Sequence, residues 1–97
     1  MKAYWIVRCH VFEPGEFAKY VELAGPIIKN FIGTFLTRGG AQIELEGEGY
    51  ERTVLIEFDS FNEAKACYHS DDYQQALIHI KKSAERLVVL VLSLIHI

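Results

Sequence analysis

The stretch Ile56-Glu57-Phe58-Asp59-Ser60-Phe61 decides the fold, because it joins the end of an apolar strand pattern to the start of a helix. The segment from Arg52 to Phe58 contains the apolar run Val54-Leu55-Ile56, and a short apolar run of this kind is typical of a β-strand. Ser60 is followed three residues later by Glu63, which is the spacing of a capping box at the start of a helix. A strand that leads directly into a helix sets the order of the elements on both sides of it.

The spacing of apolar residues assigns the N-terminal part of the chain. Alternation from Ala3 to Val11 predicts a first strand, and apolar residues at steps of three and four from Phe17 to Phe31 predict an amphipathic helix. Pro26 removes a backbone donor inside that helix, so we expect a kink or a restart near Gly25. The segment from Thr34 to Arg38 is predicted to be a short second strand.

Glycines separate the elements of the middle segment. Gly39 and Gly40 indicate a bend or a bulge, because glycine adopts backbone conformations that a side chain disfavours. Alternation resumes from Ala41 to Glu46, which predicts another length of strand. The segment from Gly47 to Gly49 is then predicted to be the turn of a hairpin, with Arg52 to Phe58 as the returning strand.

A second helix start lies at Ser70-Asp71-Asp72, where a capping hydroxyl precedes two carboxylates suited to the positive end of a helix. A last strand is predicted from Leu87 to Leu92. The order strand, helix, strand, strand, helix, strand predicts the α+β class and a ferredoxin-like βαββαβ sandwich, with a four-stranded antiparallel sheet and the helices on one face. The first and third strands are then neighbours.

Length and composition exclude several classes of protein. The 97 residues predict a single domain over 1–97, and a net charge of −3 without a basic cluster argues against a nucleic-acid partner. The N-terminus lacks the pattern of a secretory signal, which predicts a cytoplasmic protein, and the apolar C-terminal run is too short to span a membrane. Cys9 and Cys67 form no CxxC motif and are expected to be buried, and no cluster of ligand-type residues predicts a metal or a cofactor.

The strand alternation divides the sheet residues between two faces. One set faces the helices, while the opposite face mixes apolar and ionic side chains, namely Tyr4, Ile6, Arg8, His10, Leu36, Arg38, Thr53, Leu55 and Glu57. A solvated sheet face is polar along its length, so we expect another sheet to cover this one. The sequence therefore predicts a homodimer that packs through the sheet face and encloses a partly polar cavity.

Some residues of this face are candidates for a site. Tyr4, Arg8, Arg38 and Glu57 are expected to bind a small anionic metabolite, because guanidinium groups present paired donors to a planar anion. Glu57 and His10 are the candidates for proton transfer. The structural alternatives are that Arg8 and Glu57 form an ion pair that fixes the strand register, and that His10 is a hydrogen-bonded residue at the rim.

A resemblance to a known family is carried by the residues between about positions 2 and 90. These are Tyr4-Trp5-Ile6-Val7, Phe35-Leu36-Thr37-Arg38-Gly39-Gly40, Arg52, Val54-Leu55-Ile56-Glu57-Phe58, Ser60, Ala64, Tyr68, Ser70, Tyr73 and Gln74. They resemble the domain-of-unknown-function 1330 family. The resemblance implies the dimeric α+β barrel superfamily, whose wider relatives include cofactor-independent monooxygenases, muconolactone isomerases and haem-degrading enzymes. No residue here matches their catalytic sets, so the resemblance implies an assembly and not a reaction.

Two features depart from the pattern of that family. Asp59 stands where a proline usually follows the third strand, and the chain ends in Leu92-Ser93-Leu94-Ile95-His96-Ile97 where family members have a short segment containing Val-Glu-Gly. This ending resembles a translated sequencing-adapter read-through, so we interpret about residues 92–97 as a non-native tail. The alternative is an authentic strand extension that adds to the dimer interface.

Two classes of function remain open from the sequence. One is a small cofactor-independent enzyme, an isomerase or a monooxygenase-like protein, acting on a small anionic organic molecule. The other is a non-catalytic binding or stress-related dimer, whose cavity holds a metabolite or is filled by packing. In an enzyme, neutral isosteres of Arg8 or Glu57 would remove turnover and preserve the fold, whereas in a structural pair they would lower stability.

Overall fold

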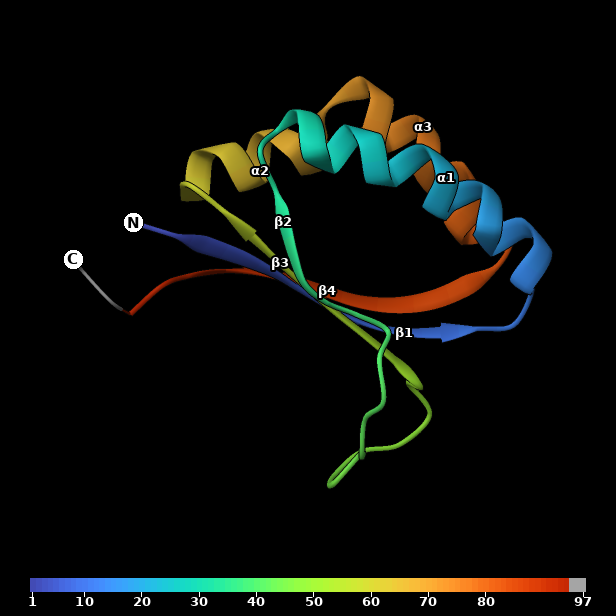
Figure 1. Cartoon of the computed structure of the whole chain (residues 1–97). Helices are drawn as coiled ribbons and strands as arrows, with labels where there is room; N and C mark the ends of the chain where they lie inside the picture. Colours follow the sequence, from blue (N-terminus) through green and yellow to red (C-terminus); the bar gives the residue numbers. More distant parts are fainter. Residues whose placement is uncertain (95–97) are drawn as a thin grey trace.

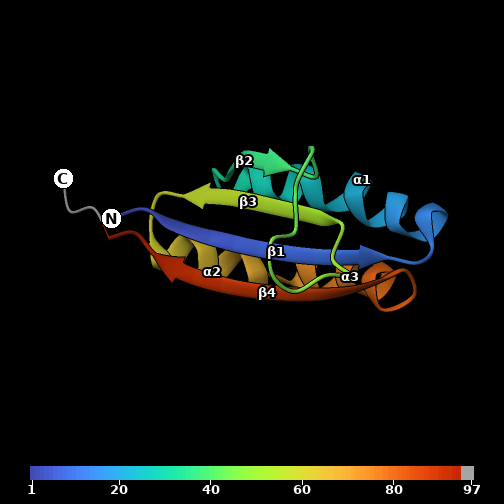
Figure 2. The same cartoon turned by 90° about the horizontal axis from the view of Figure 1, so that it is seen from below.

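The computed structural model describes residues 1–94 and shows four strands in one antiparallel sheet, in the order β2-β3-β1-β4 (Figure 1). The strands are β1 (Ala3–Val11), β2 (Thr34–Arg38), β3 (Arg52–Phe58) and β4 (Ala84–Leu92), and the helices are α1 (Pro14–Asn30), α2 (Phe61–His69) and α3 (Asp71–Lys81). The helices lie on one face of the sheet, and the segment between β2 and β3 extends from the other face (Figures 1 and 2). The predicted ferredoxin-like α+β fold is confirmed, with β1 and β3 as central neighbours.

Serine hydroxyls begin both C-terminal helices, as the sequence predicts. The Ser60 hydroxyl accepts a hydrogen bond of 3.0 Å from the backbone N–H of Glu63, and the Ser70 hydroxyl accepts one of 3.3 Å from the N–H of Tyr73. The Ser70 hydroxyl also donates to the carbonyl of Cys67 at 2.8 Å, so one side chain ends α2 and begins α3. Each of these bonds satisfies a backbone group that a helix end leaves without an intrahelical partner.

The long helix α1 is continuous through Pro26, so the predicted restart near Gly25 does not occur. Ala24 and Ile28 are both buried on either side of the proline. Their packing against the sheet holds the helix together even though Pro26 lacks one backbone donor.

The segment between β2 and β3 contains no strand, and the prediction of a strand from Ala41 to Glu46 is wrong. Ile43 and Leu45 are 84% and 89% exposed, so the alternation there does not reflect a buried face. The chain leaves the sheet at Gly39, whose φ of 74° lies in the left-handed region that favours glycine. A side chain at this position would also collide with the guanidinium of Arg52.

Aromatic rings fill the core between the sheet and the helices. Trp5 lies with its ring centre 5.1 Å from Phe58 and 5.1 Å from Tyr73. Its indole N–H donates to the carbonyl of Ala64 at 3.0 Å, which ties α2 to the centre of β1. The residues of β1 that were predicted to face the helices are buried or half-buried, and both cysteines are buried free thiols.

The last strand begins at Ala84, three residues earlier than predicted. Arg86 therefore belongs to β4 and lies opposite Cys9 of β1, on the side of the sheet that faces the helices. The strand includes Leu92, and predictions for residues 95–97 lie outside the described residues.

Candidate functional site

The strand register separates the two ionic residues that were expected to pair on the outer face of the sheet. Arg8 lies opposite Thr53, whereas Glu57 lies opposite Tyr4. Four residues along a strand correspond to about 13 Å, so the two side chains belong to different ends of the face. The predicted Arg8–Glu57 ion pair is therefore wrong.

Arg8 instead binds the segment between β2 and β3, which lies on the outer face of the sheet. Its Nη2 atom lies 2.8 Å from Oε2 of Glu44 and also donates to the carbonyl of Tyr50 at 3.3 Å. Glu57 has a different partner, since its Oε1 lies 3.8 Å from Nζ of Lys2. A groove of about 470 Å³ opens between Arg8 and this segment, but Glu44 already offsets the charge of the arginine there.

His10 is a hydrogen-bonded residue at the rim, in agreement with its structural interpretation. Its Nδ1 lies 2.8 Å from Oε1 of Glu51, whose other oxygen accepts the backbone N–H of Val11 at 2.7 Å. The hydrogen bond to Glu51 raises the pKa of His10, and the same bond lowers the pKa of Glu51 to about 2. The pair joins the end of β1 to the start of β3.

The outer face is apolar over a wide area because β4 contributes to it. Tyr4, Ile6 and Leu55 are half-buried on this face, and the β4 residues opposite β1 there are exposed, namely Leu87, Val89 and Val91. Leu36 of β2 is exposed as well. The mixed apolar and ionic face that the sequence predicts is therefore present, except for the position of Arg38.

Arg38 lies on the helix side of the sheet, so its predicted place beside Arg8 is wrong. Phe35 is opposite Ile56, but Thr37 is opposite Leu55, so Leu36 is an additional residue in the ladder. Such a bulge reverses the alternation for every residue that follows it. The guanidinium of Arg38 consequently turns back over the Phe35 ring, with 4.1 Å between its central carbon and the ring centre.

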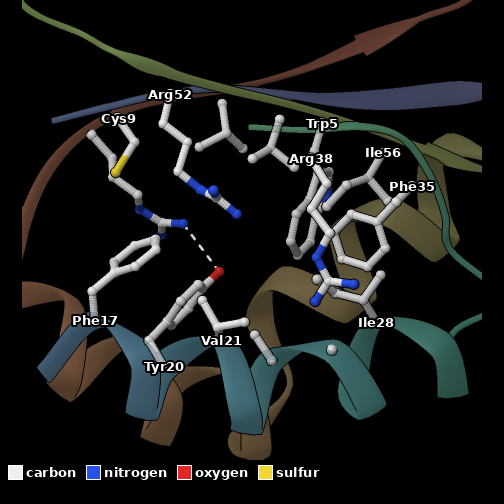
Figure 3. Close-up of a pocket in the computed structure, with 15 residues that line it drawn as sticks. Trp5, Cys9, Phe17, Tyr20, Val21, Ile28, Phe35, Arg38, Arg52 and Ile56 are labelled. Atoms are coloured by element: carbon white, nitrogen blue, oxygen red, sulfur yellow. Dashed lines mark hydrogen bonds between the residues drawn. The ribbon is translucent and has the colours of Figure 1, made fainter. Parts of the chain in front are cut away.

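This reversal brings Arg38 to a pocket between the sheet and α1, shown in Figure 3. The pocket encloses about 40 Å³ and is lined mainly by apolar side chains, including Trp5, Val7, Val21, Ala24 and Ile28. Three arginines from three strands complete it: Arg38 of β2, Arg52 of β3 and Arg86 of β4.

The three guanidinium groups each lie near an aromatic ring. Arg52 lies 5.4 Å from the ring centre of Phe17, and Arg86 lies 5.2 Å from that of Tyr20. Figure 3 shows the side chains of Arg38 and Arg52 directed into the space between the sheet and α1. Stacking of this kind orients a guanidinium and leaves its N–H donors at the edge available.

The charges of these arginines have no acidic partner among the residues that line the pocket, which include no Asp or Glu. The ion pairs found within residues 1–94 do not involve Arg38, Arg52 or Arg86. The Nε atom of Arg52 is buried and makes no hydrogen bond in the described part of the chain. A buried donor without an acceptor costs free energy, so this arrangement favours an anion.

Other groups near the pocket are less suited to chemistry. Cys9 lines it, but burial raises the pKa of the thiol, so the nucleophilic thiolate is disfavoured. Within residues 1–94, no group of three His, Cys, Asp or Glu side chains is placed to hold a metal ion. None of the helices described has the length and hydropathy needed to cross a bilayer.

Sequence reasoning missed Arg52, Arg86 and Tyr20 as site residues. Arg52 is two residues before Val54, and this spacing along a strand places both side chains on the side of the sheet that faces the helices. Arg86 lies one residue before the predicted start of the last strand, whereas the observed strand begins at Ala84 and includes it.

The comparisons with known proteins agree with this architecture. The model of the family described as a domain of unknown function (DUF1330) matches residues 2–94. The chain belongs to this family. No curated protein sequence matches this DUF1330 protein at a significant level.

Solved structures similar to the DUF1330 protein share its fold at low sequence identity. A protein of unknown function from Rhodopseudomonas palustris has a TM-score of 0.79 at 13% identity, over 98% of this chain and 84% of that one. A dimeric ferredoxin-like protein of unknown function from Jannaschia has a TM-score of 0.70 at 19% identity, over 96% and 100% of the two chains. SnoaB, a cofactor-independent oxygenase from Streptomyces nogalater, has a TM-score of 0.66 at 9% identity, over 95% of this chain and 92% of that one.

Proposed function

We propose that this protein binds a small organic anion in the pocket between the sheet and α1. The observation that carries the proposal is the presence of Arg38, Arg52 and Arg86 in an otherwise apolar pocket whose lining has no carboxylate. A guanidinium is always charged, and its planar set of donors matches the two oxygens of a carboxylate. The apolar residues beside it suit the organic part of the ligand.

Arg38 forms the mouth of this site. It is the exposed member of the three arginines, and the absence of a side chain at Gly25 lets its guanidinium lie close to α1. A space of about 40 Å³ holds only a few water molecules, so an organic ligand enters by displacing the Arg38 side chain. The guanidinium then closes over the bound anion.

We further propose that the protein acts as a homodimer whose outer sheet faces pack together. The exposed Leu36, Leu87, Val89 and Val91 support this assembly, because an apolar patch of this kind is typical of an interface. The similar Jannaschia protein is described as dimeric. We place the dimer in the cytoplasm, where its free thiols Cys9 and Cys67 would stay reduced.

Catalysis is a second candidate function of the same pocket. The similarity to the cofactor-independent oxygenase SnoaB favours turnover of an anion that itself reacts with oxygen. Oxygen consumption during incubation with a bound acid tests this candidate, and binding without any consumption or product would favour a non-catalytic module.

Calorimetry with benzoate, salicylate, octanoate and pyruvate tests the anion site. We expect at least one of these acids to bind, and we expect Arg52→Met to weaken its affinity by about 10- to 100-fold, as loss of a charged hydrogen bond predicts. Arg8→Met is the matched control, because it removes an arginine from the opposite face of the sheet. Equal losses in both variants, or no binding of any acid at millimolar concentration, would refute the pocket as the site.

A further inference from the structure

Two tyrosine hydroxyls meet beside the pocket. The hydroxyl oxygens of Tyr20 and Tyr73 are 2.6 Å apart, and Nη1 of Arg86 donates to both, at 3.1 Å and 3.3 Å. Tyr20 lines the pocket and is 9% exposed, whereas Tyr73 is completely buried and does not line it. The dashed line in Figure 3 ends at the hydroxyl of Tyr20, which points from α1 toward the sheet.

The protons of this cluster can be assigned by counting donors and acceptors. Arg86 only donates, so each tyrosine oxygen receives one hydrogen bond from it. The contact between the two hydroxyls uses the proton of one tyrosine. In the described part of the chain, the Tyr20 oxygen is the acceptor within reach of the Tyr73 proton.

The opposite orientation is unfavourable. If Tyr20 donated to Tyr73, the Tyr73 proton would be buried without an acceptor, and a buried unpaired donor is costly. Burial also raises the pKa of Tyr73, so this hydroxyl keeps its proton. Tyr73 is therefore the donor within the pair, and the proton of Tyr20 is left for the pocket.

We propose that the Tyr20 hydroxyl donates a hydrogen bond to an oxygen of the bound anion, and that the ligand is a carboxylate or an enolate whose oxygen accepts it. This inference rests on the proposed anion site and adds an uncharged donor to it. Two donations, from Tyr73 and Arg86, polarise the Tyr20 oxygen and strengthen its own O–H as a donor. Tyr20 thereby becomes a specificity-determining residue, because it requires an acceptor on the ligand.

Two tyrosine variants test this role through ligand affinity. Tyr20→Phe and Tyr73→Phe each remove one hydroxyl of the same pair, so they disturb packing in a similar way. We expect Tyr20→Phe to weaken binding of the tightest acid by about tenfold or more, and Tyr73→Phe to change it by less than about threefold. An equal loss in the two variants, or a larger loss in Tyr73→Phe, would overturn the inference.

A measurement without ligand separates this inference from the proposed function. In protein labelled with carbon-13 at tyrosine Cζ, we expect the hydroxyl proton that exchanges slowly with water to couple to Tyr73, and its signal to disappear in Tyr73→Phe. A slowly exchanging proton on Tyr20 would overturn the assignment. If the slowly exchanging proton is on Tyr73 but no acid binds the wild-type protein, the proposed anion site is refuted, whereas the assignment of Tyr73 as the donor within the hydroxyl pair is supported.

Discussion

Arg38 stacks on Phe35, with 4.1 Å from its guanidinium carbon to the ring centre, although residues three apart in a regular strand point to opposite faces. The additional residue Leu36 in β2 makes this contact possible. A single bulge thus moves a positive charge from the outer face of the sheet to the pocket.

Deletion of Leu36 should preserve the pocket. Phe35 and Thr37 would then be consecutive in the ladder, and Arg38 would stay opposite Val54 on the helix side. We expect calorimetry to show acid binding within about threefold of the wild type, because the arginine keeps its position. Insertion of one alanine between Thr37 and Arg38 is the contrasting variant, which should move Arg38 to the outer face. Loss of binding on deletion, or its retention on insertion, would contradict the role given to the bulge.

Gly39→Ala should destabilise the fold and disturb Arg52. Gly39 has a φ of 74°, and an added Cβ would collide with the Arg52 guanidinium. We expect a loss of about 2 kcal/mol in the free energy of unfolding, measured by urea denaturation. Gly40→Ala is the control, since a Cβ there meets no atom within 4 Å. Equal effects of the two substitutions would show that the close approach of Arg52 is unimportant.

The His10–Glu51 pair should make a pH-dependent contribution to stability. The hydrogen bond to Glu51 raises the pKa of His10. The contribution of His10 to the free energy of unfolding is therefore fully present below about pH 6.5, and it declines as the pH rises through the folded-state pKa. Because the pKa of Glu51 is lowered to about 2, its contribution is complete above about pH 4.5 and declines as the pH falls toward 2. The difference in unfolding free energy between the wild type and His10→Gln should therefore be greatest between about pH 4.5 and 6.5.

The difference in unfolding free energy between the wild type and His10→Gln should also become smaller in high salt, because the side chains of His10 and Glu51 are both exposed. A difference that is constant from pH 3 to pH 9 would mean that His10 contributes by packing alone.

Val89→Glu should dissociate the dimer while the subunit stays folded. Val89 is 52% exposed in the single chain, so the charge is solvated in the monomer and buried only in the proposed interface. We expect sedimentation velocity to show a dimer for the wild type and a monomer for the variant, with unchanged far-UV circular dichroism. Leu23→Glu is the control on the helix side, where Leu23 is 45% exposed. A wild-type monomer at micromolar concentration would refute the interface.

Local patterns in the sequence predicted the strands and helices well where each residue had a regular partner. The alternation of β1 continues through its full pairing with β3, and Ser60 and Ser70 carry their capping signals in the sequence itself. The alternation around Ile43 was misleading, because Gly39 turns the chain away before a partner strand is reached.

The pocket was harder to predict because it depends on a bulge and on a strand boundary. Leu36 is an ordinary strand residue, and nothing in its neighbourhood shows that it is additional to the ladder. Arg52 and Arg86 each stand at the polar end of an apolar run, where an arginine normally marks the end of a strand and not a buried site. The register of the sheet places both of them opposite Cys9, on the side that faces the helices.

The position of Trp5 gives the protein a built-in optical reporter. Trp5 borders the pocket, its indole is fixed by the bond to Ala64, and it is the single tryptophan of the chain. An anion that enters next to this ring alters the electric field and the quenching around one defined fluorophore. Emission from unlabelled protein can therefore follow ligand entry in stopped-flow experiments, without any engineered probe.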